Sequence, residues 1–210
     1  MGTLSAGNVT SIPLRELSQQ TSPRTFFSFA EIFGNDHPVE LELGCGKGFF
    51  LSAVARKFPE INFVGVDRGE RWMRKGRSRF ESHSLPNLRF FKFHAWTFLE
   101  RFVALESANV FHIYFPDPWP KRRHRKRRLV DQDFLILLHE RLQVGGHIEI
   151  ATDDHPYFLS IQEMVSKTRD RWRSYRESVN QRLIYEEEKT LYEFKYKLCG
   201  KGIYYLELEK

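Results

Sequence analysis

The chain has 210 residues, of which 41% are hydrophobic and 29% are charged. This length predicts one domain with a sizeable core. No apolar run approaches the length of a membrane span, and residues 1–25 lack the apolar centre of a secretory signal. Cys45 and Cys199 form neither a disulfide framework nor a metal-ligand pair, so we expect a cytoplasmic protein that needs no membrane and no metal.

The net charge is +6, and a single short run carries the whole surplus. Seven Lys and Arg residues lie between Lys121 and Arg128, interrupted only by His124. Without these seven, the chain has 26 Lys and Arg residues against 27 Asp and Glu residues. A charge run by itself is more often a solvated surface. Because the surplus is so concentrated, however, it also indicates a local anionic partner.

Strands and helices alternate along most of the chain. Residues 1–25 are predicted to be a flexible N-terminal arm, followed by a single domain over residues 26–210. The expected strands are 39–43, 62–67, 88–93, 109–115 and 147–152. The expected helices are 26–33, 49–58, 68–83, 96–106, 129–142 and 156–167. Segment 169–189 reads as a strand or loop, and residues 191–198 and 202–208 are expected to pair as a closing hairpin.

This alternation predicts an α/β fold with a doubly wound, mostly parallel sheet and a closing antiparallel C-terminal hairpin. In such sheets ligands bind at the carboxyl ends of the strands, near the point where the strand order reverses. The residues expected at those ends are Glu42, Gly44, Asp67, His94, Ala95, Phe115 to Asp117, Thr152 and Asp153. They form the predicted rim of the site.

A glycine-rich loop follows the first strand. Glu42 precedes Gly44, Gly46 and Gly48, and these glycines allow a sharp turn and a close approach to a ligand. Phe49 stands where a dinucleotide fingerprint needs its third glycine, and the P-loop pattern is also absent. The pattern resembles the first motif of Rossmann-like, S-adenosylmethionine-dependent methyltransferases. An acid beside the loop suits the sulfonium and amino group of that cofactor better than it suits a pyrophosphate.

Asp67 ends the second strand, where its carboxylate can accept hydrogen bonds from two ribose hydroxyls. It can equally cap the helix expected from Arg68 onward, and the two roles are compatible.

The fourth strand runs into an irregular loop that carries one acid and one indole. Prolines at 116, 118 and 120 fix the backbone around Asp117 and Trp119 and exclude regular structure there. Trp119 offers a surface on which an extruded base can stack, or it anchors the loop to the core; both interpretations stay open.

The segment FPDPWPK (115–121), the basic run, Thr152-Asp153 and TLYEFK (190–195) together resemble the bacterial tRNA (guanine-N7)-methyltransferase family. The similarity extends over about Val39 to Lys195. It implies transfer of a methyl group from S-adenosylmethionine to N7 of the variable-loop guanosine at tRNA position 46, with S-adenosylhomocysteine as the product. We expect a monomer or a homodimer.

The resemblance also implies roles for individual residues. Asp117 matches the catalytic aspartate of the family, where a buried carboxylate would stabilise the positive charge that develops on the purine. The implied cofactor-binding residues are Glu42, Gly44, Gly46, Asp67, His94, Ala95 and Asp117. The implied substrate-binding residues are Lys121, Asp153, Thr190 and Glu193; for the last two, an ordinary strand-edge pair is the alternative. Arg123, Arg125, Lys126, Arg127 and Arg128 are expected to contact the tRNA backbone, with steep salt dependence.

His94 departs from the family pattern, which usually has an acid or amide before the alanine as an acceptor for the adenine amino group. A neutral imidazole can accept through one ring nitrogen, so we expect cofactor affinity to weaken when the ring takes up a proton. Three alternatives remain: a nucleotide-dependent oxidoreductase, a non-catalytic RNA-binding subunit, and a methyltransferase acting on another RNA or a protein. The missing dinucleotide fingerprint argues against the first.

Overall fold

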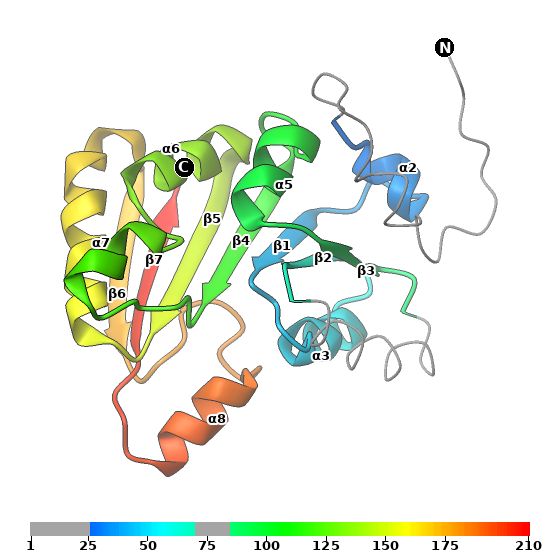
Figure 1. Ribbon diagram of the computed structural model, residues 1–210. Coiled ribbons are helices and arrows are strands. Elements are labelled where there is room, and N and C mark those ends of the chain that lie inside the picture. Colours follow the sequence, from blue (N-terminus) through cyan, green and yellow to red (C-terminus); the bar gives the residue numbers. More distant parts are fainter. Residues whose placement is uncertain (1–25, 70–84) are drawn as a thin grey trace.

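The computed structural model describes residues 26–69 and 85–210, and seven strands within them form one sheet (Figure 1). The order is β3-β2-β1-β4-β5-β7-β6. The strands are β1 (Val39–Leu43), β2 (Asn62–Asp67), β3 (Leu88–Lys92), β4 (Ala108–Tyr114), β5 (Leu142–Thr152), β6 (Ser174–Val179) and β7 (Tyr204–Glu209). Strands β1 to β5 pair in parallel, while β7 lies antiparallel between β5 and β6. The predicted fold class is confirmed.

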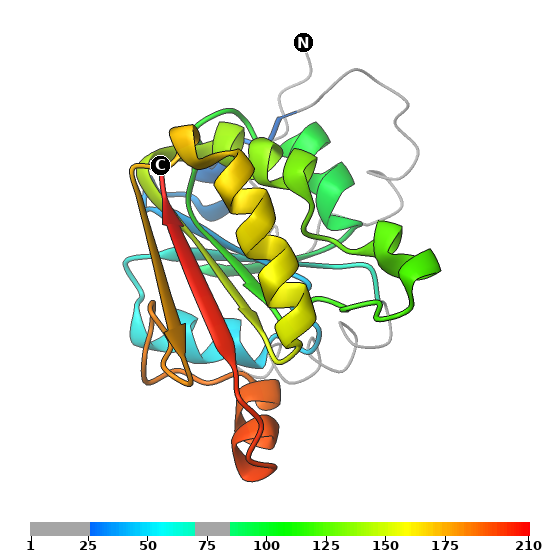
Figure 2. The same ribbon diagram turned by 90° about the vertical axis from the view of Figure 1, so that its left-hand side faces the viewer.

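Helices cover both faces of the sheet. The described helices are α2 (Phe29–Phe33), α3 (Phe49–Lys57), α5 (Ala95–Phe102), α6 (Gln132–Arg141), α7 (His155–Lys167) and α8 (Leu191–Leu198), with the short 3-10 helices η1 (Arg122–Arg127) and η2 (Arg169–Arg171). Figure 2 shows α5, α6 and α7 side by side on one face and α3 on the other. Two apolar clusters fill the space between these layers. The strand order reverses between β1 and β4, which places the expected ligand site at their carboxyl ends.

The C-terminal region corrects one expectation. Residues 191–198 were expected to be a strand, but they form helix α8, and the antiparallel partner of β7 is β6. The helix begins with a reciprocal cap, because the Glu193 amide donates to Thr190 Oγ1 (3.1 Å) and the Thr190 amide donates to Glu193 Oε2 (2.6 Å). This capping box outweighs the alternation of apolar and polar residues that suggested a strand.

Strand β5 begins five residues earlier than expected and runs through Gly145 and Gly146. Gly145 has a φ of 77°, and a Cβ on Gly146 would lie 2.7 Å from the Asn109 carbonyl oxygen, so this stretch requires glycine. The predicted N-terminal arm and residues 70–83 of the predicted helix 68–83 lie outside the described residues.

Candidate active site

A pocket of about 1050 Å³ opens at the carboxyl ends of the central strands. It brings together residues that the sequence placed on the rim, from four separate segments of the chain. Predicted site residues that line it are Glu42, Gly44, Gly46, Asp67, His94, Ala95, Asp117, Lys126, Arg127, Arg128 and Thr190. The predicted residues Lys121, Arg123, Arg125, Asp153 and Glu193 lie outside its lining.

The glycine loop joins β1 to α3 through left-handed backbone. Gly44, Gly46 and Gly48 have φ values of 90°, 54° and 65°, a region that side chains with a Cβ rarely adopt. A Cβ on Gly44 or Gly46 would meet nothing within 4 Å, so these two glycines are required for conformation and not for space. The Gly44 amide donates to the Val66 carbonyl (2.8 Å), which fixes the loop against β2.

Glu42 lies on the floor of this pocket with only 4% of its surface exposed. Its Oε2 atom has no hydrogen-bond partner among the described residues. Burial raises the pKa of Glu42 to about 8, and the nearby charges of Asp67 and Glu193 add to this while Arg182 opposes it. A buried carboxyl group with an unused oxygen is well suited to a cationic group of a ligand.

Asp67 braces the glycine loop from the end of β2. Its Oδ2 accepts from the Gly46 amide (2.9 Å), and its Oδ1 accepts from the Gly69 amide (2.6 Å). Each oxygen keeps a second lone pair for a ligand hydroxyl. The predicted contact with ribose stays a prediction, and the helix that Asp67 was expected to cap lies almost wholly outside the described residues.

His94 and Ala95 occupy the predicted place, where β3 leads into α5. His94 is exposed and lies at the N-cap position of α5 without a side-chain capping bond, so its ring is not engaged in the helix start. Ala95 is buried at the first turn, and both residues line the pocket.

The FPDPWP loop is strained at two points. Phe115 and Trp119 have φ values of 52° and 43°, and non-glycine residues in this region are typical of functional sites. The Phe115 ring packs 5.4 Å from the ring of Tyr196 on α8, which ties the loop to that helix. Asp117 lies between Phe115 and Trp119 and lines the pocket. Its side chain is exposed, contrary to the buried position that was expected.

Trp119 is held by the basic run. The Arg127 guanidinium lies over its ring at 5.1 Å from the centroid, and the His124 ring meets it edge-on at 5.8 Å. These contacts tie Trp119 to the basic run and not to the core, and Trp119 also lines the pocket, so both interpretations of its role stay open. Arg128 serves the same loop, because its Nε donates to the Pro118 carbonyl (2.8 Å) and its guanidinium lies 4.3 Å from the centroid of the Tyr157 ring.

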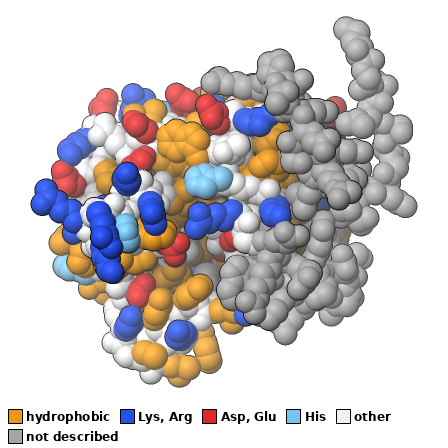
Figure 3. All heavy atoms as spheres, in the orientation of Figure 1, with side chains coloured by type: hydrophobic (Ala, Val, Ile, Leu, Met, Phe, Trp, Pro, Cys, Tyr) orange, Lys and Arg blue, Asp and Glu red, His pale blue; other side chains and the backbone are white. Residues whose placement is uncertain are grey.

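The other predicted RNA-contacting cations are exposed. Arg123, Arg125, Lys126 and Arg127 all lie on η1, no residue of which is buried. Figure 3 shows Lys and Arg side chains gathered on the side of the molecule where η1 lies. The half-buried Arg128 therefore differs from these four, and its predicted contact with tRNA stays a prediction.

Glu193 occupies a setting that the sequence did not suggest. It is buried and forms a two-point ion pair with Arg182, whose Nε and Nη2 donate at 3.0 and 2.5 Å. Tyr205 donates a further bond at 2.5 Å. Burial by itself would raise the pKa of Glu193, but Arg182 and these hydrogen bonds lower it below its usual range. The strand-edge alternative for Thr190 and Glu193 is wrong, since both residues cap α8.

Arg182 is a residue that the sequence reasoning missed. Its guanidinium lies over the rings of Phe50 (4.8 Å) and Tyr114 (4.2 Å). Both of these residues line the pocket. The following segment is fixed to the sheet, because the amides of Leu183 and Ile184 each donate to Glu149 Oε1 at 2.7 Å. This attachment positions the start of α8 beside the glycine loop.

Lys121 and Asp153 complete the predicted set. Lys121 is exposed just before η1. Asp153 is half-buried after β5, and its Oδ2 lies 3.3 Å from the Lys201 ammonium. Their predicted contacts with substrate stay predictions.

Comparisons with known proteins agree with this geometry. Residues 36–206 match a family model described as "Putative methyltransferase". A tRNA (guanine-N(7)-)-methyltransferase from Rubrobacter xylanophilus is 34% identical over 196 residues, which are 92% of this chain and 86% of that relative. The chain belongs to the tRNA (guanine-N7)-methyltransferase family.

A second member, from Syntrophotalea carbinolica, is 42% identical over 129 residues, which are 61% of this chain and 56% of that relative's length. The crystal structure of KamB, a 16S rRNA methyltransferase, has a TM-score of 0.63 at 16% identity, covering 89% of this chain and 95% of that one, and shows the same fold. Among the helices of residues 26–69 and 85–210, none is long and apolar enough to cross a bilayer. Those residues also hold no cluster of three or more His, Cys, Asp or Glu side chains suited to a metal ion.

Proposed function

We propose that this protein transfers a methyl group from S-adenosylmethionine to N7 of a guanosine in tRNA, the variable-loop guanosine at position 46. One observation carries the proposal. The glycine loop with its buried, unpaired Glu42 and the strained loop with Asp117 line the same pocket, and exposed cations of η1 stand at its edge. The names of the family members cited above support tRNA as the substrate.

The residues fit the cofactor. Glu42 would hold its ammonium group, since its Oε2 is a buried side-chain acceptor without a donor among the described residues. Asp67 would accept from the ribose hydroxyls, and His94 and Ala95 would contact the adenine. When bound, S-adenosylmethionine supplies an electrophilic methyl group.

The methyl acceptor requires little acid–base chemistry. Guanine N7 carries a free lone pair and no proton, so the pocket needs to align N7 with the methyl group and no strong base is required. Asp117 would stabilise the positive charge that develops on the purine. Because Asp117 is exposed in the structure, its field would gain strength only once the RNA covers the loop and excludes water. The oligomeric state and the cytoplasmic setting stay predictions.

The decisive experiment is incubation of the protein with unmodified tRNA and methyl-labelled cofactor, followed by nucleoside mass spectrometry. Labelled N7-methylguanosine should appear from the tRNA and should be absent when the variable-loop guanosine is replaced by adenosine. Label on rRNA or protein alone would refute the tRNA assignment. RNA binding without label on any substrate would support the non-catalytic alternative.

A further inference from the structure

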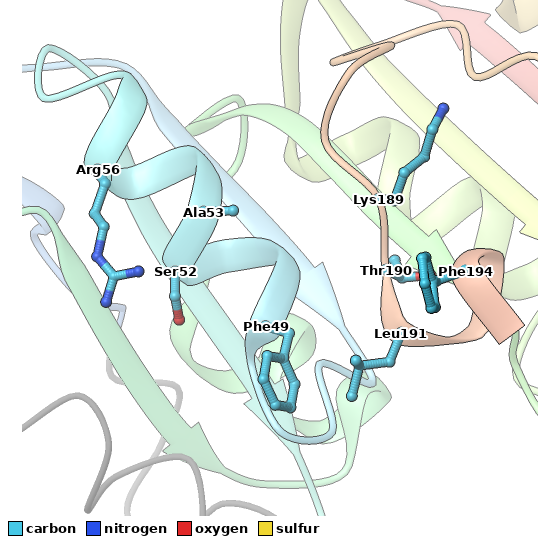
Figure 4. Close-up of a pocket in the computed structure, with 8 residues that line it drawn as sticks. All are labelled: Phe49, Ser52, Ala53, Arg56, Lys189, Thr190, Leu191 and Phe194. Atoms are coloured by element: carbon cyan, nitrogen blue, oxygen red, sulfur yellow. The ribbon is translucent and has the colours of Figure 1, made fainter.

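A second groove, of about 460 Å³, lies beside the cofactor pocket between α3 and the start of α8 (Figure 4). Its lining residues are Phe49, Ser52, Ala53, Arg56, Lys189, Thr190, Leu191 and Phe194. Phe49, Thr190 and Leu191 line the cofactor pocket as well, so the two spaces are contiguous. Figure 4 shows Phe49 and Leu191 lying across from each other at one end. An RNA strand that places one nucleotide in the pocket can therefore continue into the groove.

The groove presents apolar side chains to solvent. Phe194 is 64% exposed and Leu191 is 46% exposed, while Phe49 is half-buried at the beginning of α3. An aromatic ring exposed to this extent leaves most of its surface open to a ligand. Nucleobases of any identity stack on such rings, with about 1–3 kcal/mol per base.

The rim of the groove is cationic. Arg56 and Lys189 are exposed, and no acid is present among the described residues of the lining. The Lys189 ammonium donates to the Glu186 carbonyl (2.7 Å) and forms no ion pair within the described part of the chain. Arg56 has no ion-pair partner within the described part of the chain. From Phe49 to Arg56 the groove follows α3 for about 10 Å, the length of seven residues of helix. The apolar walls suit the base of one nucleotide, and the cations at the edge suit its phosphates.

The groove and the basic run lie on opposite sides of the pocket. Figures 1 and 2 show α3 on one side of the strand ends and η1 on the other, with α8 below them. An RNA strand held by η1 whose target base enters the pocket would leave it on the side of α3. We propose that the groove between α3 and α8 binds the nucleotide adjacent to the methylated guanosine, with its base stacked on Phe194 and its phosphate near Arg56. This inference rests on the proposed function.

The test is a double-mutant cycle between protein and RNA, measured as equilibrium binding of the tRNA. Phe194→Ala removes the stacking ring, and an abasic site at the nucleotide 5′ or 3′ of the target guanosine removes the base. At the nucleotide that stacks on Phe194, the substitution and the abasic site should each weaken binding about tenfold. The two changes together should weaken it no further there, because both remove the same contact. Leu198→Ala is the matched control, because Leu198 lies on the same helix, is 74% exposed and lies outside the groove; it should leave binding unchanged.

Arg56→Ala provides an independent measurement. Loss of one phosphate contact should reduce the slope of log affinity against log salt by about one. Additive losses at both neighbouring nucleotides, or wild-type affinity of Phe194→Ala, would overturn the proposal. A loss of S-adenosylhomocysteine affinity in Phe194→Ala in place of tRNA affinity would also overturn it. Nucleoside analysis of intact tRNA treated with the wild-type protein reports on the proposed function separately.

Discussion

Replacing Glu42 by Gln should stabilise the protein in the absence of cofactor. The pKa of Glu42 rises from an ordinary value near 4.5 to about 8 because burial disfavours its charged form. Between these two pH values the folded protein binds more protons than the unfolded chain, so the free energy of unfolding falls as pH rises. At 1.36 kcal/mol per pH unit, this cost is about 3 kcal/mol at pH 7 and approaches about 5 kcal/mol above pH 8.

Urea unfolding between pH 4 and 9 measures this effect. The advantage of Glu42→Gln over the wild type should grow by about 3 kcal/mol from pH 4 to pH 7. Glu207→Gln is the matched control: Glu207 is equally buried, at 4% exposure, but it is paired with Arg176 and His147, which lower its pKa. Its replacement should destabilise the protein at neutral pH. A Glu42→Gln advantage that does not change with pH would refute the reasoning.

The same substitution should weaken cofactor binding, because the amide cannot supply the negative charge. Calorimetry at pH 7 in buffers of different ionisation enthalpy should show release of about one proton by the wild type and none by Glu42→Gln. Stability and binding should therefore change in opposite directions at this residue, as is common where a site requires a buried charge. Equal proton release from both proteins would remove Glu42 from the binding step.

The other predictions concern the rim of the pocket. Asp117→Ala should reduce turnover by about 10²-fold or more while tRNA affinity and stability stay close to wild type, because Asp117 is exposed; unchanged turnover would exclude it from the reaction. The double variant Arg123→Ala/Arg127→Ala should weaken tRNA binding and reduce its salt slope by about two, whereas Arg173→Ala, an exposed cation paired with Glu209, should not. His94→Ala removes the ring acceptor and should weaken cofactor affinity, whereas His94→Asn keeps an acceptor and should weaken it less; equal affinity of both variants would exclude His94 as the adenine acceptor.

The fold was predictable because its central strands are short, almost uninterrupted apolar runs. Leu41, Val64 and Ile150 are typical of strands buried on both faces, and each lies in the predicted element. Residues 191–198 were misassigned because their alternation of apolar and polar side chains is typical of a strand. The signal against a strand was present in Thr190 and Glu193, three residues apart as a capping box requires.

The pocket residues were predictable as far as they lie at strand ends, where topology by itself brings them together. Arg182 was not, because the rings that it contacts, Phe50 and Tyr114, are 132 and 68 residues away in the chain and meet it only in the folded structure. The burial of Asp117 was predicted wrongly for a related reason. The local sequence defines the bend of the proline loop, but not which side of it faces the sheet.

The electrostatics of the site depend on one cation shared by several acids. Arg182 is committed to Glu193 through two hydrogen bonds, so it reduces the rise in the pKa of Glu42 without cancelling it. Buried charges that lack a partner are expensive, and a folded protein keeps one only where something else supplies the missing charge. Glu42 avoids this cost at neutral pH by keeping its proton until a cationic ligand binds, and Gly44 and Gly46 beside it leave the loop open. Arg182 pairs with Glu193, which caps α8, and this pair holds the helix in place. Because Arg182 does not pair with Glu42, that carboxyl group remains available for a cationic ligand.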